Sequence, residues 1–261
     1  MVLTDHQFFS DSIVFSAFDQ SHFYAVFTSV LLLVSVVVVA KRLDYRQNIL
    51  VCRGLSLLLC ATVMLWSLVH VKFGRFSAIE SLPLSICNLF ALIAPLLFWI
   101  PNQKRFEVIY YLVFSGTLQA IITPDPSSGY PSYSFFKYWI VHCGLIIIVI
   151  HYLVAFKLYP SVQGIWRAFL WLNLYLLCVF PINWLLDANY FYLMHKPEVP
   201  SLLDFFGPWP IYLIVSEILA MLFFALSYIP SLVARKLAGK QVIISGENET
   251  IELHCIQRRK N

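Results

Sequence analysis

A cysteine and a histidine, Cys87 and His142, are the side chains of this 261-residue chain best suited to covalent chemistry. The thiolate form of cysteine is a strong nucleophile, and a nearby imidazole can remove the thiol proton and pass it to a leaving group. This chemistry requires both side chains at one depth and a polar group that orients the imidazole. Asn183, Asp187 and Asn189 are the candidates for that supporting role.

A purely structural interpretation of the polar residues stands beside the functional one. A cysteine in an apolar helix commonly acts as a small hydrophobic side chain. Thr123 and Asp125 belong to the string Thr-Pro-Asp-Pro, which is typical of a helix end followed by a turn, although both are also candidates for supporting polar residues. Glu217 lies well inside an apolar stretch, where acids are costly, so it is predicted to be a proton or ion site.

Seven apolar stretches must position these side chains. Hydrophobic residues make up 60% of the chain and charged residues 12%, with a mean hydropathy of +0.76, whereas soluble domains carry about 25% charged residues. A membrane span needs about 20 apolar residues, and its backbone must form its own hydrogen bonds, so the sequence predicts an all-α polytopic membrane protein, a seven-helix transmembrane bundle. The predicted spans are Phe23–Ala40, Ile49–Val71, Leu82–Ile100, Val108–Ile122, Lys137–Phe156, Ile165–Leu186 and Trp209–Val233.

The basic residues predict the orientation and the domain limits. Fourteen of the eighteen Lys and Arg residues fall in the odd-numbered junctions and the C-terminal tail. Because Lys and Arg accumulate on the cytoplasmic side, the N-terminus is expected outside and the C-terminus in the cytoplasm. The predicted parts are an extracytoplasmic segment (1–22), a seven-helix domain (23–235) and a short cytoplasmic tail (236–261). Two β-type runs in that tail, split by a turn, favour a β-hairpin over 241–256.

The polar residues lie toward the outer ends of the predicted spans. Cys87 and His142 each follow the outer end of a span by about five residues, or about 7–8 Å at 1.5 Å per residue. Asn183 and Asp187 lie near the outer end of the sixth span, and Asp125 follows the fourth. This distribution predicts a cavity that opens to the outside.

Composition also restricts the partners. The net charge of +4 is expected on the cytoplasmic face, where anionic lipid head groups are the natural partner, so membrane lipids are predicted and nucleic acid is not. The six cysteines show no zinc-type spacing or paired CxxC, so no metal, cofactor or disulfide framework is predicted. The sequence indicates no particular oligomeric state.

Several strings together resemble a known family. They are Leu82-Pro83-Leu84-Ser85-Ile86-Cys87, Ile121-Ile122-Thr123-Pro124-Asp125, Phe135-Phe136 before His142, Asn189-Tyr190-Phe191-Tyr192-Leu193, and Gly207-Pro208-Trp209-Pro210. In that order, over residues 20–235, the chain resembles the YwaF-type integral membrane family of bacteria. That family is itself similar to a eukaryotic transmembrane phospholipid acyltransferase that works through a membrane cysteine.

The resemblance implies a lipid acyltransferase of the bacterial plasma (inner) membrane in which Cys87 carries the acyl group and His142 assists. Many relatives have a histidine two residues before the cysteine, where this chain has Ser85. The alternatives are a non-enzymatic transport or small-molecule-binding protein that uses Glu217 and Asp125, and a receptor. A retinal-type receptor is excluded because the seventh span contains no lysine for a Schiff base.

Overall fold

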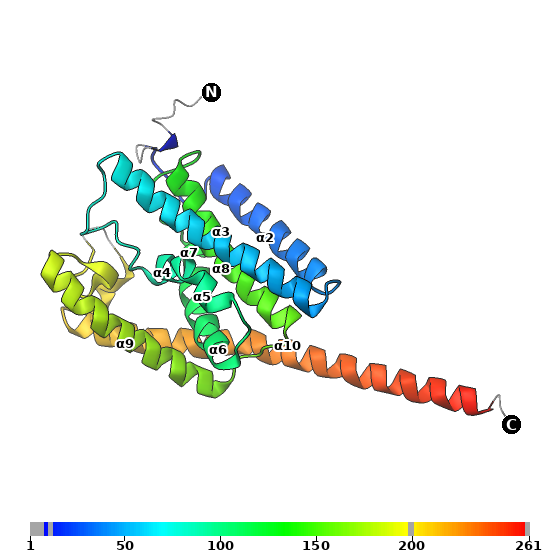
Figure 1. Ribbon diagram of the computed structural model, residues 1–261. Coiled ribbons are helices and arrows are strands. Elements are labelled where there is room, and N and C mark those ends of the chain that lie inside the picture. The colour runs from blue at the N-terminus through cyan, green and yellow to red at the C-terminus, as the bar shows by residue number, and fades with distance from the viewer. Residues whose placement is uncertain (1–7, 10–12, 198–200, 259–261) are drawn as a thin grey trace.

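The computed structural model describes residues 8–9, 13–197 and 201–258, with side chains through residue 236 except that of residue 234. Every element within those ranges is a helix, and no strand occurs among them (Figure 1). The predicted all-α fold is therefore confirmed for the part of the chain that is described.

Five of the described helices are long and apolar enough to cross a membrane, which confirms the helical membrane character predicted from composition. They are α2 (Gln20–Ala40), α3 (Tyr45–Lys72), α8 (Tyr133–Ala155), α9 (Val162–Leu186) and, within α10, Ile211–Val233. The first four begin after residues whose side chains accept a backbone N–H of the first turn, namely Asp19, Asp44, Ser132 and Ser161.

The third predicted span is broken into two short helices, which corrects the prediction of one continuous helix. α4 (Ile86–Leu92) and α5 (Ala94–Phe98) are separated at Ile93, whose ψ of 10° departs from helical geometry. Pro95 explains the break, because its ring removes one backbone donor and crowds the preceding turn.

The fourth predicted span is also irregular. α6 (Gln103–Leu112) passes through a π-helical turn, η1 (Val113–Thr117), into α7 (Leu118–Ile122). The Ser115 hydroxyl donates to the Tyr111 carbonyl at 2.5 Å and so competes with the regular helical ladder. Single π-turns inside helices are frequent at functional sites.

α8 is the central helix. It contacts α2, α3, α4, η1 and α7, and 56% of its most apolar window is buried, against 6% for α2. The close approach of α3 to α8 depends on Gly144, because a Cβ atom there would lie 2.7 Å from Cδ2 of Leu59. The central position of α8 makes its polar side chains available to several neighbouring elements.

The C-terminal part differs from the prediction. Two short 3-10 turns, η2 (Tyr190–Tyr192) and η3 (Leu202–Phe206), follow α9, and then α10 runs from Ile211 to Arg258. The backbone of 241–256 is thus part of a helix and not of the predicted β-hairpin. A helix satisfies its hydrogen bonds within one segment, whereas an isolated hairpin needs a further strand or helix to be stable.

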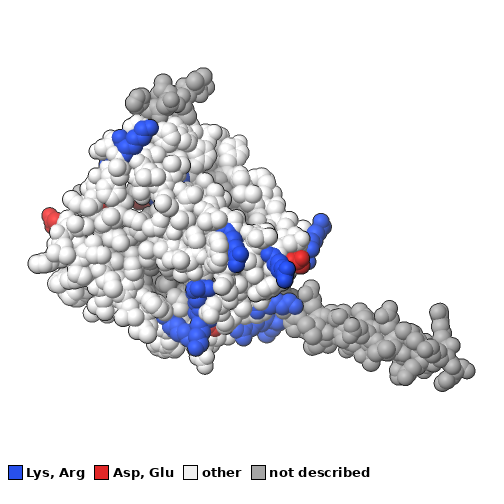
Figure 2. Space-filling view, in the orientation of Figure 1, with Lys and Arg blue, Asp and Glu red and all other residues white. Residues whose placement is uncertain are grey.

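Charge is unevenly placed on the surface. Figure 2 shows a face that is largely uncharged, with most of its Lys and Arg side chains gathered near the α2–α3 turn and the region of α6 and α10. Many large apolar side chains of the spanning helices are exposed, among them Leu31 of α2 and Leu177 of α9. An apolar belt with a basic end is the surface expected of a protein embedded in a bilayer.

Candidate functional site

Cys87 lies at the start of α4, directly opposite the π-helical turn. Its Sγ is 3.4 Å from Oγ1 of Thr117, the last residue of η1, and Thr117 is 1% exposed. Ser85 is the N-cap residue of α4 and makes no side-chain capping bond. The π-helical turn therefore presents a hydroxyl to the only thiol of α4.

His142 is oriented by its own helix. Its Nδ1 lies 2.7 Å from the carbonyl oxygen of Tyr138, one turn earlier in α8. Because a carbonyl oxygen only accepts, Nδ1 must carry the hydrogen, and a neutral ring then has its lone pair on Nε2. This is the tautomer in which Nε2 can act as a general base.

Tyr138 connects His142 with the Thr-Pro-Asp string. The two rings are 4.1 Å apart between centroids. The Tyr138 hydroxyl donates to Ala120 O at 2.6 Å and accepts from the backbone N–H of Asp125 at 3.2 Å. Thr123 donates its hydroxyl to Gln119 O at 3.1 Å. Thr123 is thus the C-cap residue of α7, the backbone of Asp125 bonds to the Tyr138 hydroxyl, and the Asp125 side chain is exposed.

Lys137 is the charged residue of α8 next to Tyr138 in the chain. Its ammonium group lies 4.5 Å from the centroid of the Trp66 ring. α4, η1 and α8 contact one another, which gathers these groups. We call Cys87, Thr117, Lys137, Tyr138 and His142 the thiol cluster.

Asn183 supports the cysteine segment and makes no bond to His142 among the described residues, contrary to its predicted role. It is fully buried and exchanges two hydrogen bonds with the backbone of Tyr190, both of 2.9 Å. The Tyr190 hydroxyl accepts from the N–H of Leu82 at 3.0 Å and donates to Ala78 O at 2.9 Å. Burial raises the pKa of Tyr190, which keeps this hydroxyl neutral and able to do both.

The other two predicted supporting residues shape the chain after α9. Asp187 ends α9 in the left-handed conformation, with φ of 53°. The Asn189 side chain accepts from the N–H groups of Met194 and His195 and donates to His195 O at 2.8 Å. Both residues therefore fix the turn that carries Tyr190, and the described structure shows no bond from either to the imidazole.

The equal depth predicted for Cys87 and His142 does not follow from their positions along the helices. α4 begins at Ile86, so Cys87 is in its first turn. α8 begins at Tyr133, four residues before the predicted start, so His142 lies more than two turns along it. Packing of α4 against α8 brings the two segments together, and a count from the span ends could not have shown this.

Glu217 is paired within the apolar region. Its Oε2 accepts a hydrogen bond of 3.0 Å from Nδ2 of Asn173, which also donates to Phe169 O. Glu217 belongs to α10 and Asn173 to α9, so the pair joins two spanning helices. A polar bond between membrane helices is expected to stabilise their contact.

A cavity of about 1050 Å³ lies elsewhere, between α2, α3 and α8. Its lining residues do not include Cys87, His142 or the other predicted site residues. Cys143, the neighbour of His142 in sequence, does line it, because successive residues of a helix point about 100° apart. This cavity is therefore not the outward-opening cavity that the sequence predicted around the site residues.

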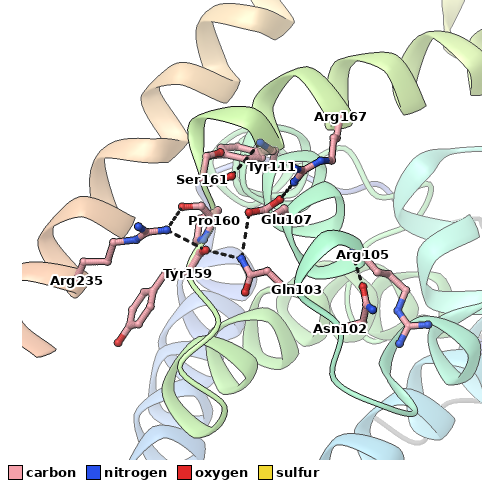
Figure 3. A network of polar contacts seen from close by, with 11 residues as sticks. Asn102, Gln103, Arg105, Glu107, Tyr111, Tyr159, Pro160, Ser161, Arg167 and Arg235 are labelled. Atoms are coloured by element: carbon pink, nitrogen blue, oxygen red, sulfur yellow. Dashed lines mark hydrogen bonds and ion pairs between the residues drawn. The ribbon is translucent and has the colours of Figure 1, made fainter.

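A second polar site, which the sequence did not predict, surrounds the buried acid Glu107 of α6. Glu107 is 3% exposed and accepts hydrogen bonds from Gln103 Nε2, at 3.1 Å, and from Arg167 NH1 of α9, with which it forms an ion pair. Figure 3 shows Gln103 and Arg167 both pointing at its carboxylate.

The same contacts extend to the α8–α9 turn and α10. Gln103 also donates to Tyr159 O at 2.7 Å, and Arg235 of α10 donates to the carbonyls of Tyr159 and Pro160 at 3.1 and 2.8 Å. The Tyr111 hydroxyl donates to Ser161 O at 2.7 Å. We call this set, together with Glu107 and Arg167, the Glu107 network. Its hydrogen bonds join α6, α9 and α10 to the α8–α9 turn (Figure 3).

Thr117, Lys137 and Glu107 are the polar residues that sequence reasoning missed. Thr117 follows Ser115 and Gly116 inside an apolar stretch, and this run of small residues is the signal that a break could occur there. Glu107 directly precedes the fourth predicted span, as Arg167 directly follows the start of the sixth. Among the residues that the structure describes, no group of three His, Cys, Asp or Glu side chains is placed to hold a metal ion.

Apolar spanning helices around a buried polar junction define the class of this protein as a polytopic helical membrane protein. Its sequence matches the model of the TMEM164 family over residues 17–228. Because the match covers most of the chain, the protein belongs to that family, a family of membrane proteins. No curated protein and no solved structure matches the chain.

Proposed function

We propose that this membrane protein is a cysteine-dependent lipid acyltransferase with Cys87 as the nucleophile. The observation that carries the proposal is the thiol cluster: the Cys87 thiol meets the Thr117 hydroxyl at 3.4 Å, and α4, which carries Cys87, packs against α8, which carries His142. A neutral imidazole with a free Nε2 lone pair is the form that can accept the thiol proton as the sulfur attacks an ester carbonyl.

In the first half-reaction, the Cys87 proton passes to Nε2 of His142 and the sulfur attacks the carbonyl carbon of a fatty acyl ester. The C–O bond of the ester breaks as the C–S bond forms, and the imidazolium returns the proton to the leaving alcohol. The Thr117 hydroxyl can donate a hydrogen bond to the sulfur in the thiolate state, since its oxygen lies within 3.4 Å.

In the second half-reaction, the hydroxyl of an acceptor lipid attacks the thioester. His142 Nε2 accepts the hydroxyl proton, a new C–O bond forms, and the C–S bond breaks to release Cys87 as the thiolate, which recovers the proton from the imidazolium. No proton or electron is gained or lost over the two steps. Membrane lipids are the proposed donor and acceptor, because a site between spanning helices is reached from the bilayer.

The family resemblance and the charge distribution support the remaining parts of the proposal. We propose seven crossings, with the broken α4–α5 and α6–η1–α7 segments as the third and fourth, the N-terminus outside and the C-terminus in the cytoplasm. The placement of basic residues supports this orientation (Figure 2). The narrower resemblance to YwaF-type proteins supports the plasma membrane of a bacterium as the location. A reporter fused after Asn261 should report cytoplasm, and an outside signal would reverse the proposed orientation.

The acyl-enzyme is the direct test. Purified protein in nanodiscs receives a phospholipid with isotope-labelled acyl chains, and peptides are analysed for a hydroxylamine-sensitive thioester. Label is expected on Cys87 in the native protein and in Cys143→Ala, and it should be lost in Cys87→Ala. A folded protein that never carries label on Cys87 would contradict the acyltransferase and favour transport or small-molecule binding.

A further inference from the structure

The cavity between α2, α3 and α8 is a separate binding site that the acyl-transfer chemistry does not use. Its volume of about 1050 Å³ lies just above the range of about 300–1,000 Å³ found for small-molecule sites. α8 forms one wall, and α2 and α3 form the other two. We call it the lateral cavity.

The lateral cavity is polar at one end and mostly apolar along the rest, with Thr28 and Ser29 as the polar residues of the α2 wall in between. Asp19, Gln20 and Ser21 line it at the start of α2, and Leu32 and Val36 line it farther along the same helix. At 1.5 Å per residue, the distance from Asp19 to Val36 is about 25 Å, most of the about 30 Å hydrocarbon thickness of a bilayer. An amphiphile with a polar head and one long apolar chain matches this gradient.

The charge at the polar end selects the head group. Asp19 is the charged residue in the lining. The backbone N–H of His22 and the hydroxyl of Ser21 donate to its Oδ1, at 2.9 and 2.7 Å, and these bonds lower the pKa of Asp19. A stable carboxylate repels a phosphate that carries no compensating charge and attracts an amine. The nearby ring of Tyr24, which also lines this end, suits a cation as well.

We propose that the lateral cavity binds a phospholipid with a zwitterionic head group, with one acyl chain between α2 and α3 and its cationic nitrogen at Asp19. Ser29 of the α2 wall does not require an aqueous occupant, because its hydroxyl already donates to Ala25 O at 2.7 Å. The bound lipid would also fill the space between α2 and the rest of the bundle, which fits the low burial of α2. This site is independent of Cys87 and of the proposed acyl transfer.

The test measures lipid that remains on the full-length protein. Native protein is equilibrated with mixed micelles of phosphatidylcholine and phosphatidylglycerol, washed in detergent and analysed by native mass spectrometry. We expect one retained phosphatidylcholine per chain. Ser29→Trp, which fills the cavity, should reduce retention by about tenfold, while Val30→Trp, on the exposed side of α2, should leave it unchanged.

Two further variants separate the parts of the proposal. Asp19→Asn keeps the helix cap and should remove the preference for phosphatidylcholine over phosphatidylglycerol. Cys87→Ala should retain lipid as the native protein does, so failure of acyl transfer and failure of this site are distinguishable. Equal retention in Ser29→Trp and native protein, or equal losses in Ser29→Trp and Val30→Trp, would overturn the proposal.

A measurement on the unmodified chain covers the case in which a variant fails to fold. Phosphatidylcholine with a diazirine in the middle of one chain is bound, washed and photoactivated. Adducts are expected on Trp139 and Cys143, which line the cavity. Adducts found only on membrane-facing residues such as Leu31, or a retained sterol or polypeptide in place of the phospholipid, would overturn the proposal.

Discussion

The thiol cluster and the Glu107 network are both polar, but they use their hydrogen bonds differently. In the network, the Glu107 carboxylate is held between Gln103 and Arg167, and Gln103 has a second partner in Tyr159 O. In the thiol cluster, the Cys87 sulfur has a long contact of 3.4 Å with Thr117, and in its hydrogen bonds with the described residues His142 uses Nδ1 and not Nε2. The network is bonded on all sides, and the cluster leaves its reactive atoms uncommitted.

This difference indicates that the Glu107 network contributes to folding stability and that the thiol cluster is suited to a chemical reaction. A buried carboxylate with strong partners stabilises the helices that supply them, because removing one partner leaves a charge in a poor solvent. A thiol and an imidazole nitrogen with few bonds add little stability but can still react with a substrate. Substitutions in the two regions should therefore affect different measurements, and the following experiments test that separation.

The largest effect is expected at the nucleophile. Cys87→Ser should reduce acyl transfer by about 10³-fold or more, the scale seen when a covalent nucleophile is removed. The serine hydroxyl can still bond to Thr117, so the melting temperature should change little. Phospholipid acyl exchange by the purified protein is the measurement, with Cys143→Ser as the matched control. Loss of folding in Cys87→Ser would show that this region also carries stability.

A somewhat smaller loss of rate is expected at the base. His142→Gln should lower kcat by about 10²- to 10⁴-fold, the usual contribution of a general acid–base group. His22→Gln is the control, because His22 accepts from Phe18 N–H at 3.1 Å and contacts Ile121 O at 3.1 Å through its other nitrogen. That control should lower stability and preserve kcat. Equal rate losses in both variants would remove the special role of His142.

The Glu107 network should respond in stability. Glu107→Leu is expected to cost about 3 kcal/mol of unfolding free energy, the lower end of the range for breaking a buried pair, since Arg167 is 36% exposed and can be hydrated. Adding Arg167→Met should recover most of this loss, because two apolar side chains can replace a buried pair. Unfolding in mixed micelles measures both.

Glu217→Gln keeps an oxygen that can accept the hydrogen bond from Asn173. This substitution should therefore cost less than about 1 kcal/mol of unfolding free energy in the same measurement.

The smallest effect on the rate is expected at the π-helical turn. Thr117→Val removes the hydroxyl that contacts Cys87 and keeps the side-chain shape. A hydrogen bond to a charged group contributes about 1.5–3 kcal/mol, so the rate should fall by about 10- to 150-fold. Thr117→Ser should restore it. If Thr117→Val alters the melting temperature and not the rate, the hydroxyl belongs with the stabilising contacts.

The sequence predicted the helical membrane fold well because hydropathy is a local property. The starts of α2 and α9 lie within three residues of the predicted starts, since Asp19 and Ser161 cap them. Breaks at Ile93 and η1 were missed because each depends on one proline or on a small change in hydrogen-bond register. The predicted hairpin over 241–256 was wrong for a related reason: the β-type residues of this segment have a weak conformational preference that context overrides, and the backbone is helical.

The candidate site was predicted in part. Cys87 and His142 were chosen by chemistry, and Asn183 was chosen for its polarity within a span. The structure attaches Asn183 to Tyr190 and, through it, to the segment that carries Cys87. Thr117 and Glu107 were not chosen, because nothing in the order of residues shows which turns of different helices meet.

The sequence by itself determined that this protein is helical and lies in a membrane, because the cost of an unsatisfied backbone in lipid depends only on the run of apolar residues. It also placed a thiol and an imidazole among the few polar groups within those runs. Only the tertiary structure decided that Cys87 faces Thr117, that Glu107 pairs with Arg167, and that a cavity lies beside α8. Each of these depends on which helix faces pack together, and in lipid that choice is made by shape and hydrogen bonding between helices far apart in the chain.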